Sequence, residues 1–185
     1  MKISLWILSL LTAAEAAAGE PPSNLVWTDI RDLGVEGQGW RDVAQPYDRL
    51  PAKAEGKVPP AVWNLSRHSA GMHIRFVSDT TELSARWALG LSDLAMPHMA
   101  ATGVSGLDLY VRSAEGPWRW LAVAKPTGPS NNVALISCLP SGKREYLLYL
   151  PLYNSTKSVE LGIPGGATLA RSGAWGPGPR KPIVF

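Results

Sequence analysis

Hydrophobic and polar residues alternate along much of the chain after residue 61. In the segment 71–76 the apolar side chains occupy every second position, while His73 and Arg75 point to the opposite side of an extended backbone. A second alternating run, 82–89, follows the turn-forming residues 78–81. A period of two residues predicts β-strands, and the short polar turn between these two runs predicts that they form a β-hairpin.

Comparable runs recur about every ten residues through the rest of the chain. Further strands are predicted at residues 107–112, 118–123, 132–139, 145–150, 158–163 and 167–171. Short strands at this spacing are typical of sandwiches and barrels, and no long stretch shows helical spacing. We therefore predict an all-β fold, an antiparallel β-sandwich of jelly-roll type, with Trp118 and Trp120 on one strand face in its core.

The N-terminus has the pattern of a secretory signal peptide. Lys2 precedes an apolar run that extends to about Ala14, and the small residues Ala16–Gly19 follow it. This predicts a signal peptide at residues 1–18 and a secreted or periplasmic protein. The apolar run is shorter than the ~20 residues that cross a bilayer, so no membrane association is expected after cleavage.

Composition narrows the functional classes. The net charge of +3 comes from scattered Lys and Arg residues, which disfavours nucleic acid as a partner. The single cysteine, Cys138, excludes an intramolecular disulfide. Because it lies in the apolar run 133–139, we expect a buried, inert thiol rather than a nucleophile.

Candidate catalytic chemistry is sparse. The three histidines, His68, His73 and His98, lack the spacing of metal ligands, and neither a Gly-x-Ser-x-Gly motif nor a Gly-rich phosphate loop is present. Ser69 adjoins His68, but neighbours on a strand point to opposite faces, which favours a structural pair over a catalytic dyad. The residues predict no catalytic group, no metal and no cofactor.

Tryptophan is the more suggestive residue type. Most tryptophans of a sandwich pack in its core, yet Trp40 lies in the Gly-rich loop 37–40, where a side chain is more easily exposed. Exposed aromatic rings can stack on sugar rings, so Trp40 is the best candidate for a surface platform.

Four motifs in a fixed order carry a family resemblance. They are Gly106-Leu107-Asp108-Leu109-Tyr110, WNLSRHSAG at 63–71, AMPHM at 95–99 and REYLLYLPLYN at 144–154. With them, the chain from about Trp27 to Phe185 resembles the N-terminal GxDLY-type domain of secreted SGNH (GDSL-type) esterases. The resemblance implies a jelly-roll-like sandwich similar to carbohydrate-binding modules, followed by a hydrolase domain.

The same resemblance implies where the sandwich ends. Residues 19–172 are expected to form it, and residues 173–185 to form a Gly/Pro linker and the first strand, Lys181–Phe185, of a hydrolase domain missing from this chain. The family's nucleophilic serine block, oxyanion-hole residues and Asp-x-x-His motif are absent from the sequence. No catalytic residue of the family is therefore carried over.

Three functional hypotheses remain open. The first is a non-catalytic domain of an exported SGNH-type esterase that shapes the ester-substrate site of a C-terminal hydrolase domain and contacts a glycan or an acylated small molecule. Its candidate substrate-binding residues, which could equally serve only to stabilise turns, are Arg67, His68, Met96, Pro97, His98 and Trp40. The second is a free-standing carbohydrate-binding module, and the third an independent enzyme of this fold.

Overall fold

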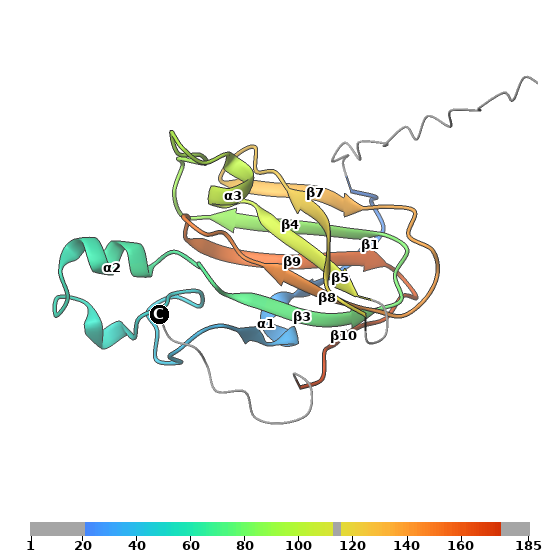
Figure 1. Ribbon diagram of the computed structural model, residues 1–185, viewed down its shortest axis with the longest axis horizontal. Helices are drawn as coiled ribbons and strands as arrows, with labels where there is room; N and C mark the ends of the chain where they lie inside the picture. The colour runs from blue at the N-terminus through green and yellow to red at the C-terminus, as the bar shows by residue number, and fades with distance from the viewer. Residues whose placement is uncertain (1–20, 113–115, 175–185) are drawn as a thin grey trace, which may run out of the picture.

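The computed structural model describes residues 21–112 and 116–174 and shows two β-sheets packed face to face (Figure 1). The strands are β1 (Leu25–Asp29), β2 (Val35–Glu36), β3 (His73–Ser78), β4 (Leu83–Leu89), β5 (Leu107–Arg112), β6 (Arg119–Ala124), β7 (Ser130–Ile136), β8 (Arg144–Tyr149), β9 (Thr156–Pro164) and β10 (Leu169–Arg171). The helices are α1 (Ile30–Leu33), the 3₁₀ turn η1 (Ala52–Ala54), α2 (Pro60–Ser66) and α3 (Ala101–Ser105). The predicted signal peptide and the predicted strand 181–185 lie outside the described residues.

Both sheets are antiparallel. One has the order β1-β9-β4-β7, and the other has the order β10-β3-β8-β5-β6, with β2 paired to the edge of β3. Every strand predicted from alternation overlaps an observed strand, and the predicted all-β sandwich is confirmed. Two edge elements, β1 and β2, were not predicted as strands.

The predicted hairpin of β3 and β4 is wrong. Strand β3 pairs with β8 and β10, whereas β4 pairs with β7 and β9, so the connection between them crosses from one sheet to the other. Each strand carries one fully buried apolar face, which includes Phe76 on β3 and Leu83 on β4. Because these faces meet across the core, the two strands must lie in opposite layers.

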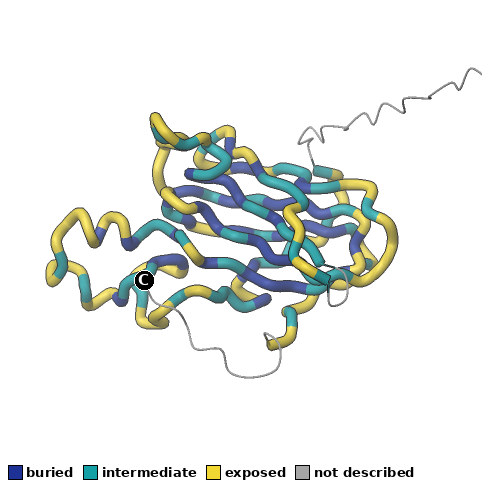
Figure 2. Tube along the Cα trace, viewed as in Figure 1, coloured by how far each residue is buried: buried dark blue, intermediate teal, exposed yellow. Residues whose placement is uncertain are grey.

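The core lies between the sheets, where the strands are most deeply buried (Figure 2). Phe76 and Tyr146 stack at 5.1 Å between ring centroids. Trp87 is buried in the same cluster, and its indole Nε1 donates a hydrogen bond to the carbonyl of Ser105 at 3.1 Å, which fixes the end of α3. A buried indole N–H needs such a partner.

The prediction that Trp118 and Trp120 lie in the core is wrong. The register between β5 and β6 shifts between Leu109 and Tyr110, so that Trp120 pairs opposite Tyr110 and is 58% exposed. Trp118 is half-buried under the guanidinium of Arg112, which lies 4.7 Å from its ring centroid. One irregularity in strand pairing thus overturns an assignment based on strict alternation.

The expectation of a buried thiol is also wrong, because Cys138 is exposed. Strand β7 ends at Ile136, and Cys138 has a φ of 58°, the left-handed backbone of a turn. The apolar run that suggested burial therefore continues past the end of its strand.

The GLDLY motif occupies a position where α3 passes directly into β5. A Cβ on Gly106 would lie 2.3 Å from the carbonyl oxygen of Thr102 and 2.5 Å from that of Ala124. Leu107 and Leu109 are fully buried, whereas Asp108 and Tyr110 lie on the outer face of the sheet. In this motif Gly106 therefore allows the close approach of three backbone segments, and Leu107 and Leu109 belong to a core strand.

We predict that Gly106→Ala destabilises the domain by about 3 kcal/mol, because the clash is with backbone atoms that cannot rotate away. Gly165→Ala is the matched control, since no atom lies within 4 Å of its added Cβ. Urea unfolding of both variants measures the difference. Equal midpoints would contradict this account of the motif.

Candidate functional site

Three chain segments meet at one end of the sandwich. They are residues 37–72 with η1 and α2, residues 90–106 with α3, and the connection 150–156 between β8 and β9 (Figure 1). Such loop clusters on a rigid scaffold are the usual positions of binding sites in sandwiches. Most of the sequence-predicted site residues fall within these segments.

The connection 150–156 is hydrogen-bonded to both other segments. The Ser69 hydroxyl donates to the carbonyl of Pro151 at 2.9 Å and shares a 2.8 Å hydrogen bond with the hydroxyl of Thr156. On the other side, the amide of Tyr153 donates to the carbonyl of Val104 at 3.0 Å. Ser69 is fully buried in these contacts, which gives it the structural role that the sequence favoured.

Asn154 fixes the segment 90–106. Its Oδ1 accepts a hydrogen bond from the amide of Leu91 at 3.0 Å, and its Nδ2 donates to the carbonyl of Leu91 at 3.2 Å and to the Ser105 hydroxyl at 3.0 Å. The side chain is fully buried. A buried amide satisfied in this way holds its neighbours in one geometry, because each lost hydrogen bond would leave a polar group unpaired.

Two adjoining hollows open at this end of the sandwich. The first, here called the His68 hollow, has a volume of about 250 Å³ and is lined by Arg49, Leu65, His68, Ala70, Leu152 and Tyr153. The second, the Trp40 hollow, has a volume of about 340 Å³ and is lined by Trp40, Arg49, Leu50, Val62, Leu65 and Ser66. They share Arg49 and Leu65, so the two sequence-predicted residues His68 and Trp40 lie on either side of a common wall.

Arg49 is fixed in that wall by backbone carbonyls. Its Nε donates to the carbonyl of His68 at 3.0 Å, and its Nη2 donates to the carbonyl of Leu65 at 2.6 Å. These carbonyls lie at the C-terminal end of α2, where a cation is favoured. Among the described residues, no carboxylate forms an ion pair with Arg49, so its charge remains available to the two hollows.

Arg67 is held by other residues of the segment 37–72, here called the α2 lobe. Its Nε donates to Oδ1 of Asp48 at 2.8 Å, and its guanidinium lies 5.4 Å from the centroid of the Trp63 ring. Asp48 is buried and also accepts a hydrogen bond from the amide of Gln45 at 2.9 Å. Burial raises the pKa of the Asp48 carboxyl, an effect that the Gln45 hydrogen bond and Arg67 oppose.

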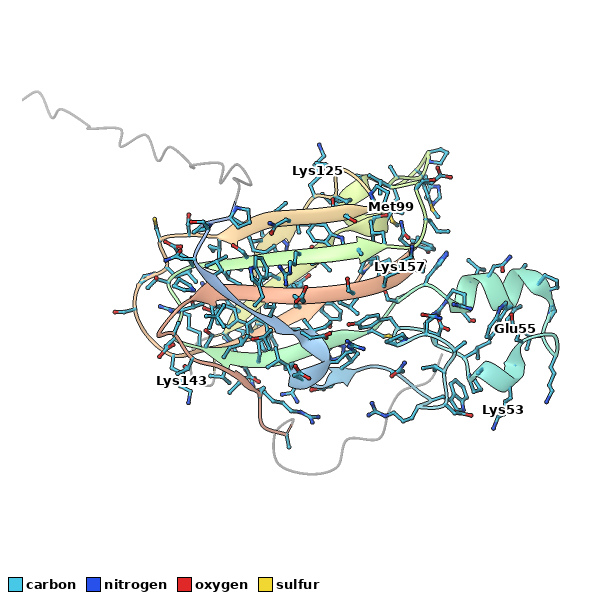
Figure 3. The ribbon with its side chains drawn as sticks, turned by 180° about the vertical axis from the view of Figure 1, so that it is seen from behind. Lys53, Glu55, Met99, Lys125, Lys143 and Lys157 are labelled. Atoms are coloured by element: carbon cyan, nitrogen blue, oxygen red, sulfur yellow. The ribbon has the colours of Figure 1, made fainter. Side chains whose placement is uncertain are left out.

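Met96, Pro97 and His98 form a separate turn at the same end. Backbone hydrogen bonds of 2.9 and 3.1 Å between Met96 and Met99 close it, and Pro97 and His98 are exposed at its tip. Figure 3 shows Met99 at the same end as Lys53 and Glu55 of the α2 lobe, across the strand ends from them. None of the three predicted turn residues lines either hollow.

The structure adds wall residues that sequence reasoning did not select. Leu65 and Tyr153 lie within the WNLSRHSAG and REYLLYLPLYN motifs, so those motifs were available as a signal. Arg49 lies outside every motif. Its role depends on contacts with residues 16 and 19 positions away, which no local pattern shows.

Within 21–112 and 116–174, no group of three or more His, Cys, Asp or Glu side chains is arranged to hold a metal ion. No helix in these ranges has the length and apolar character needed to cross a membrane.

Burial lowers the pKa of the His68 imidazole below its ordinary value of 6.5, and the nearby positive charge of Arg49 lowers it further. His68 is therefore neutral at pH 7 and can accept a hydrogen bond from a molecule in the hollow. The His68 hollow therefore combines a hydrogen-bond acceptor, His68, with a fixed cation, Arg49, and apolar walls.

Comparison with known proteins gives a family. The model of the GxDLY family, described as the N-terminus of SGNH-hydrolase-type esterases, matches residues 25–169. No curated protein matches the sequence significantly.

Two solved structures are similar to the chain. A protein proposed to be a GDSL-like lipase, from Bacteroides ovatus ATCC 8483, superposes with a TM-score of 0.75 at 27% identity over 81% of this chain. The salicylyl-acyltransferase SsfX3 from a tetracycline biosynthetic pathway superposes with a TM-score of 0.55 at 17% identity over 84% of this chain, which shows a shared fold. In each case the chain spans 44% of the neighbour's length.

The lowered pKa of His68 makes stability depend on pH. Because the folded pKa lies below 6.5, this contribution to stability is present above pH 6.5 and is lost as the pH falls through the folded pKa. We predict that wild-type protein loses stability relative to His68→Gln between pH 7 and pH 5. Thermal unfolding at both pH values measures this loss, with His98→Gln at the exposed turn as the control.

An NMR titration of the His68 ring provides the direct check. A midpoint at or above 6.5, or equal pH dependence of wild type and His68→Gln, would show that the imidazole is not shielded as described.

Proposed function

Because the chain belongs to the GxDLY family, the N-terminal domains of SGNH-hydrolase-type esterases, we propose that it is the non-catalytic accessory domain of an exported SGNH-type esterase. In this proposal the domain shapes the ester-substrate site of a hydrolase domain that follows it. The observation that carries the proposal is the His68 hollow, which offers binding groups at a loop-rich end of the sandwich. In the described residues, the serine beside that hollow, Ser69, is buried and committed to structural hydrogen bonds.

In this proposal the hydrolase domain and the sandwich domain have different roles. The hydrolase domain would supply the serine that attacks the ester carbonyl. The His68 hollow would hold a part of the substrate distant from the reacting bond, a glycan or a small acylated molecule. Neutral His68 would accept a hydrogen bond from a substrate hydroxyl, and Arg49 would attract a carbonyl or carboxylate oxygen. Binding a distant part of the substrate places the ester close to the nucleophile.

A free-standing carbohydrate-binding module is the second candidate. Trp40 is 47% exposed at the edge of its hollow, which leaves one ring available to stack on a sugar. An independent enzyme is the third hypothesis. The Ser69 hydroxyl gives it no support, because this hydroxyl is hydrogen-bonded to Pro151 and Thr156.

Export is part of the proposal and rests on the first 18 residues of the sequence. We expect a bacterial host expressing residues 1–185 to release a protein whose N-terminal sequence begins at Gly19. Edman sequencing of the periplasmic or culture fraction measures this. A cytoplasmic product that retains Met1 would contradict export.

We predict that purified residues 19–185 do not hydrolyse p-nitrophenyl acetate above background, whereas the intact gene product with its hydrolase domain does. In the intact enzyme, His68→Ala should raise KM for the natural ester by about 5- to 10-fold, the effect of one lost hydrogen bond, with kcat nearly unchanged. Lys143→Ala is the control, because Lys143 lies at the opposite end from Lys53 (Figure 3).

Three outcomes would overturn the proposal. The first is a coding sequence with no hydrolase domain beyond the Phe185 codon. The second is ester turnover by the isolated domain that His68→Ala abolishes, which would indicate an independent enzyme. The third is saccharide binding by the isolated domain that Trp40→Ala abolishes, without any associated esterase, which would indicate a carbohydrate-binding module.

A further inference from the structure

Exposed apolar side chains are concentrated around the two hollows. Of the eight large apolar residues that are exposed in the described part of the chain, five line the hollows: Trp40, Val62, Leu65, Leu152 and Tyr153. The other three, Val26, Leu91 and Trp120, line neither. Single exposed apolar residues are common on proteins, but a contiguous group of them indicates an interaction surface.

Helix α2 shows the same feature within one element. Trp63 and Ser66, three positions apart, are buried against the lobe, while Val62 and Leu65, also three positions apart, face outward and are 46% and 51% exposed. A surface helix usually presents polar side chains to water. Large apolar side chains of this helix therefore face both the lobe and the solvent, which fits an element packed between two bodies.

Arg49 adds a charge to this apolar surface. It lines both hollows, and its described hydrogen bonds through the guanidinium go to two backbone carbonyls. An interface with an apolar centre and an arginine anchor is the usual composition of a protein–protein contact. The complementary surface would present apolar side chains with a carboxylate or a carbonyl oxygen opposite Arg49.

We infer that the Trp40 hollow, with the outward face of α2, is the docking surface for the hydrolase domain of the same polypeptide. This inference rests on the proposed function. It is supported by the family, whose members are N-terminal parts of esterases, and by the 44% of each neighbour's length that the chain spans. Two domains joined in one chain usually share an interface of about 600–1,500 Å².

The Trp40 hollow adjoins the proposed substrate wall. Docking on the Trp40 hollow would also place the hydrolase domain beside the His68 hollow, because the two share Leu65 and Arg49. One contact would thus position the partner next to the proposed substrate wall.

The test uses the intact gene product with its hydrolase domain and two matched pairs of variants. Val62→Lys is compared with Val26→Lys, which changes an equally apolar side chain that is 57% exposed on β1. Trp40→Ala is compared with Trp120→Ala on β6, whose side chain is exposed to a similar degree. The readout is the rate at which a protease cleaves segment 173–185, since an undocked linker is cut faster.

We expect Val62→Lys and Trp40→Ala each to raise the cleavage rate about tenfold, which corresponds to a loss of roughly 1.4 kcal/mol of docking free energy. Both control variants should be cleaved like wild type. The four variants of the isolated domain should keep the thermal midpoint of the wild-type domain, which shows that folding is intact.

Unchanged cleavage in Val62→Lys and Trp40→Ala would overturn the inference, and so would faster cleavage only in Val26→Lys or Trp120→Ala, which would place docking on another face. A soluble glycan that protects the Trp40 hollow in the intact protein would also overturn it. These outcomes can occur in an active esterase. The proposed function fails instead if the hydrolase domain is missing, if the isolated domain turns over esters through His68, or if it binds saccharide through Trp40 without an associated esterase.

Discussion

The candidate site depends on one buried hydrogen-bond system at the end of the sandwich. The connection between β8 and β9 is bonded to the α2 lobe through Ser69 and to the segment before β5 through Asn154, and both side chains are fully buried. A buried polar group that loses its partner costs about 1–3 kcal/mol, so these contacts hold the connecting segments in a single arrangement. That arrangement brings Leu152 and Tyr153 opposite Leu65 and creates the His68 hollow.

The α2 lobe presents the surface to which both proposals assign a role. Trp63 anchors the helix on its inner side, and Arg49 caps the helix end through the carbonyls of Leu65 and His68. The outer side is left apolar, with a fixed positive charge between two hollows. In the proposed accessory role, the apolar walls and the fixed charge would contact a neighbouring domain and part of its substrate.

Alternation along the chain was enough to predict nearly all of the strands and the sandwich, because a half-buried strand must place apolar residues at every second position. It could not predict which strands pair. Strands β3 and β4 are adjacent in sequence and lie in different sheets, and the shifted register beside Tyr110 turns Trp120 to the outside. In the candidate site, loop composition and motifs point to Trp40 and His68, which line the two hollows. The position of Arg49 depends on contacts distant in sequence, which no local pattern reveals.

In the proposed arrangement, the end of the sandwich formed by the α2 lobe packs against a hydrolase domain that follows it. Hydrogen exchange of the isolated domain and of the intact gene product measures this most directly, because a docked surface loses local opening and solvent contact. We expect slower exchange in the intact protein for peptides that cover α2 and the segment 150–156, with the edge strands β1 and β6 unchanged. Slower exchange confined to β1 or β6, or none anywhere in the domain, would contradict it.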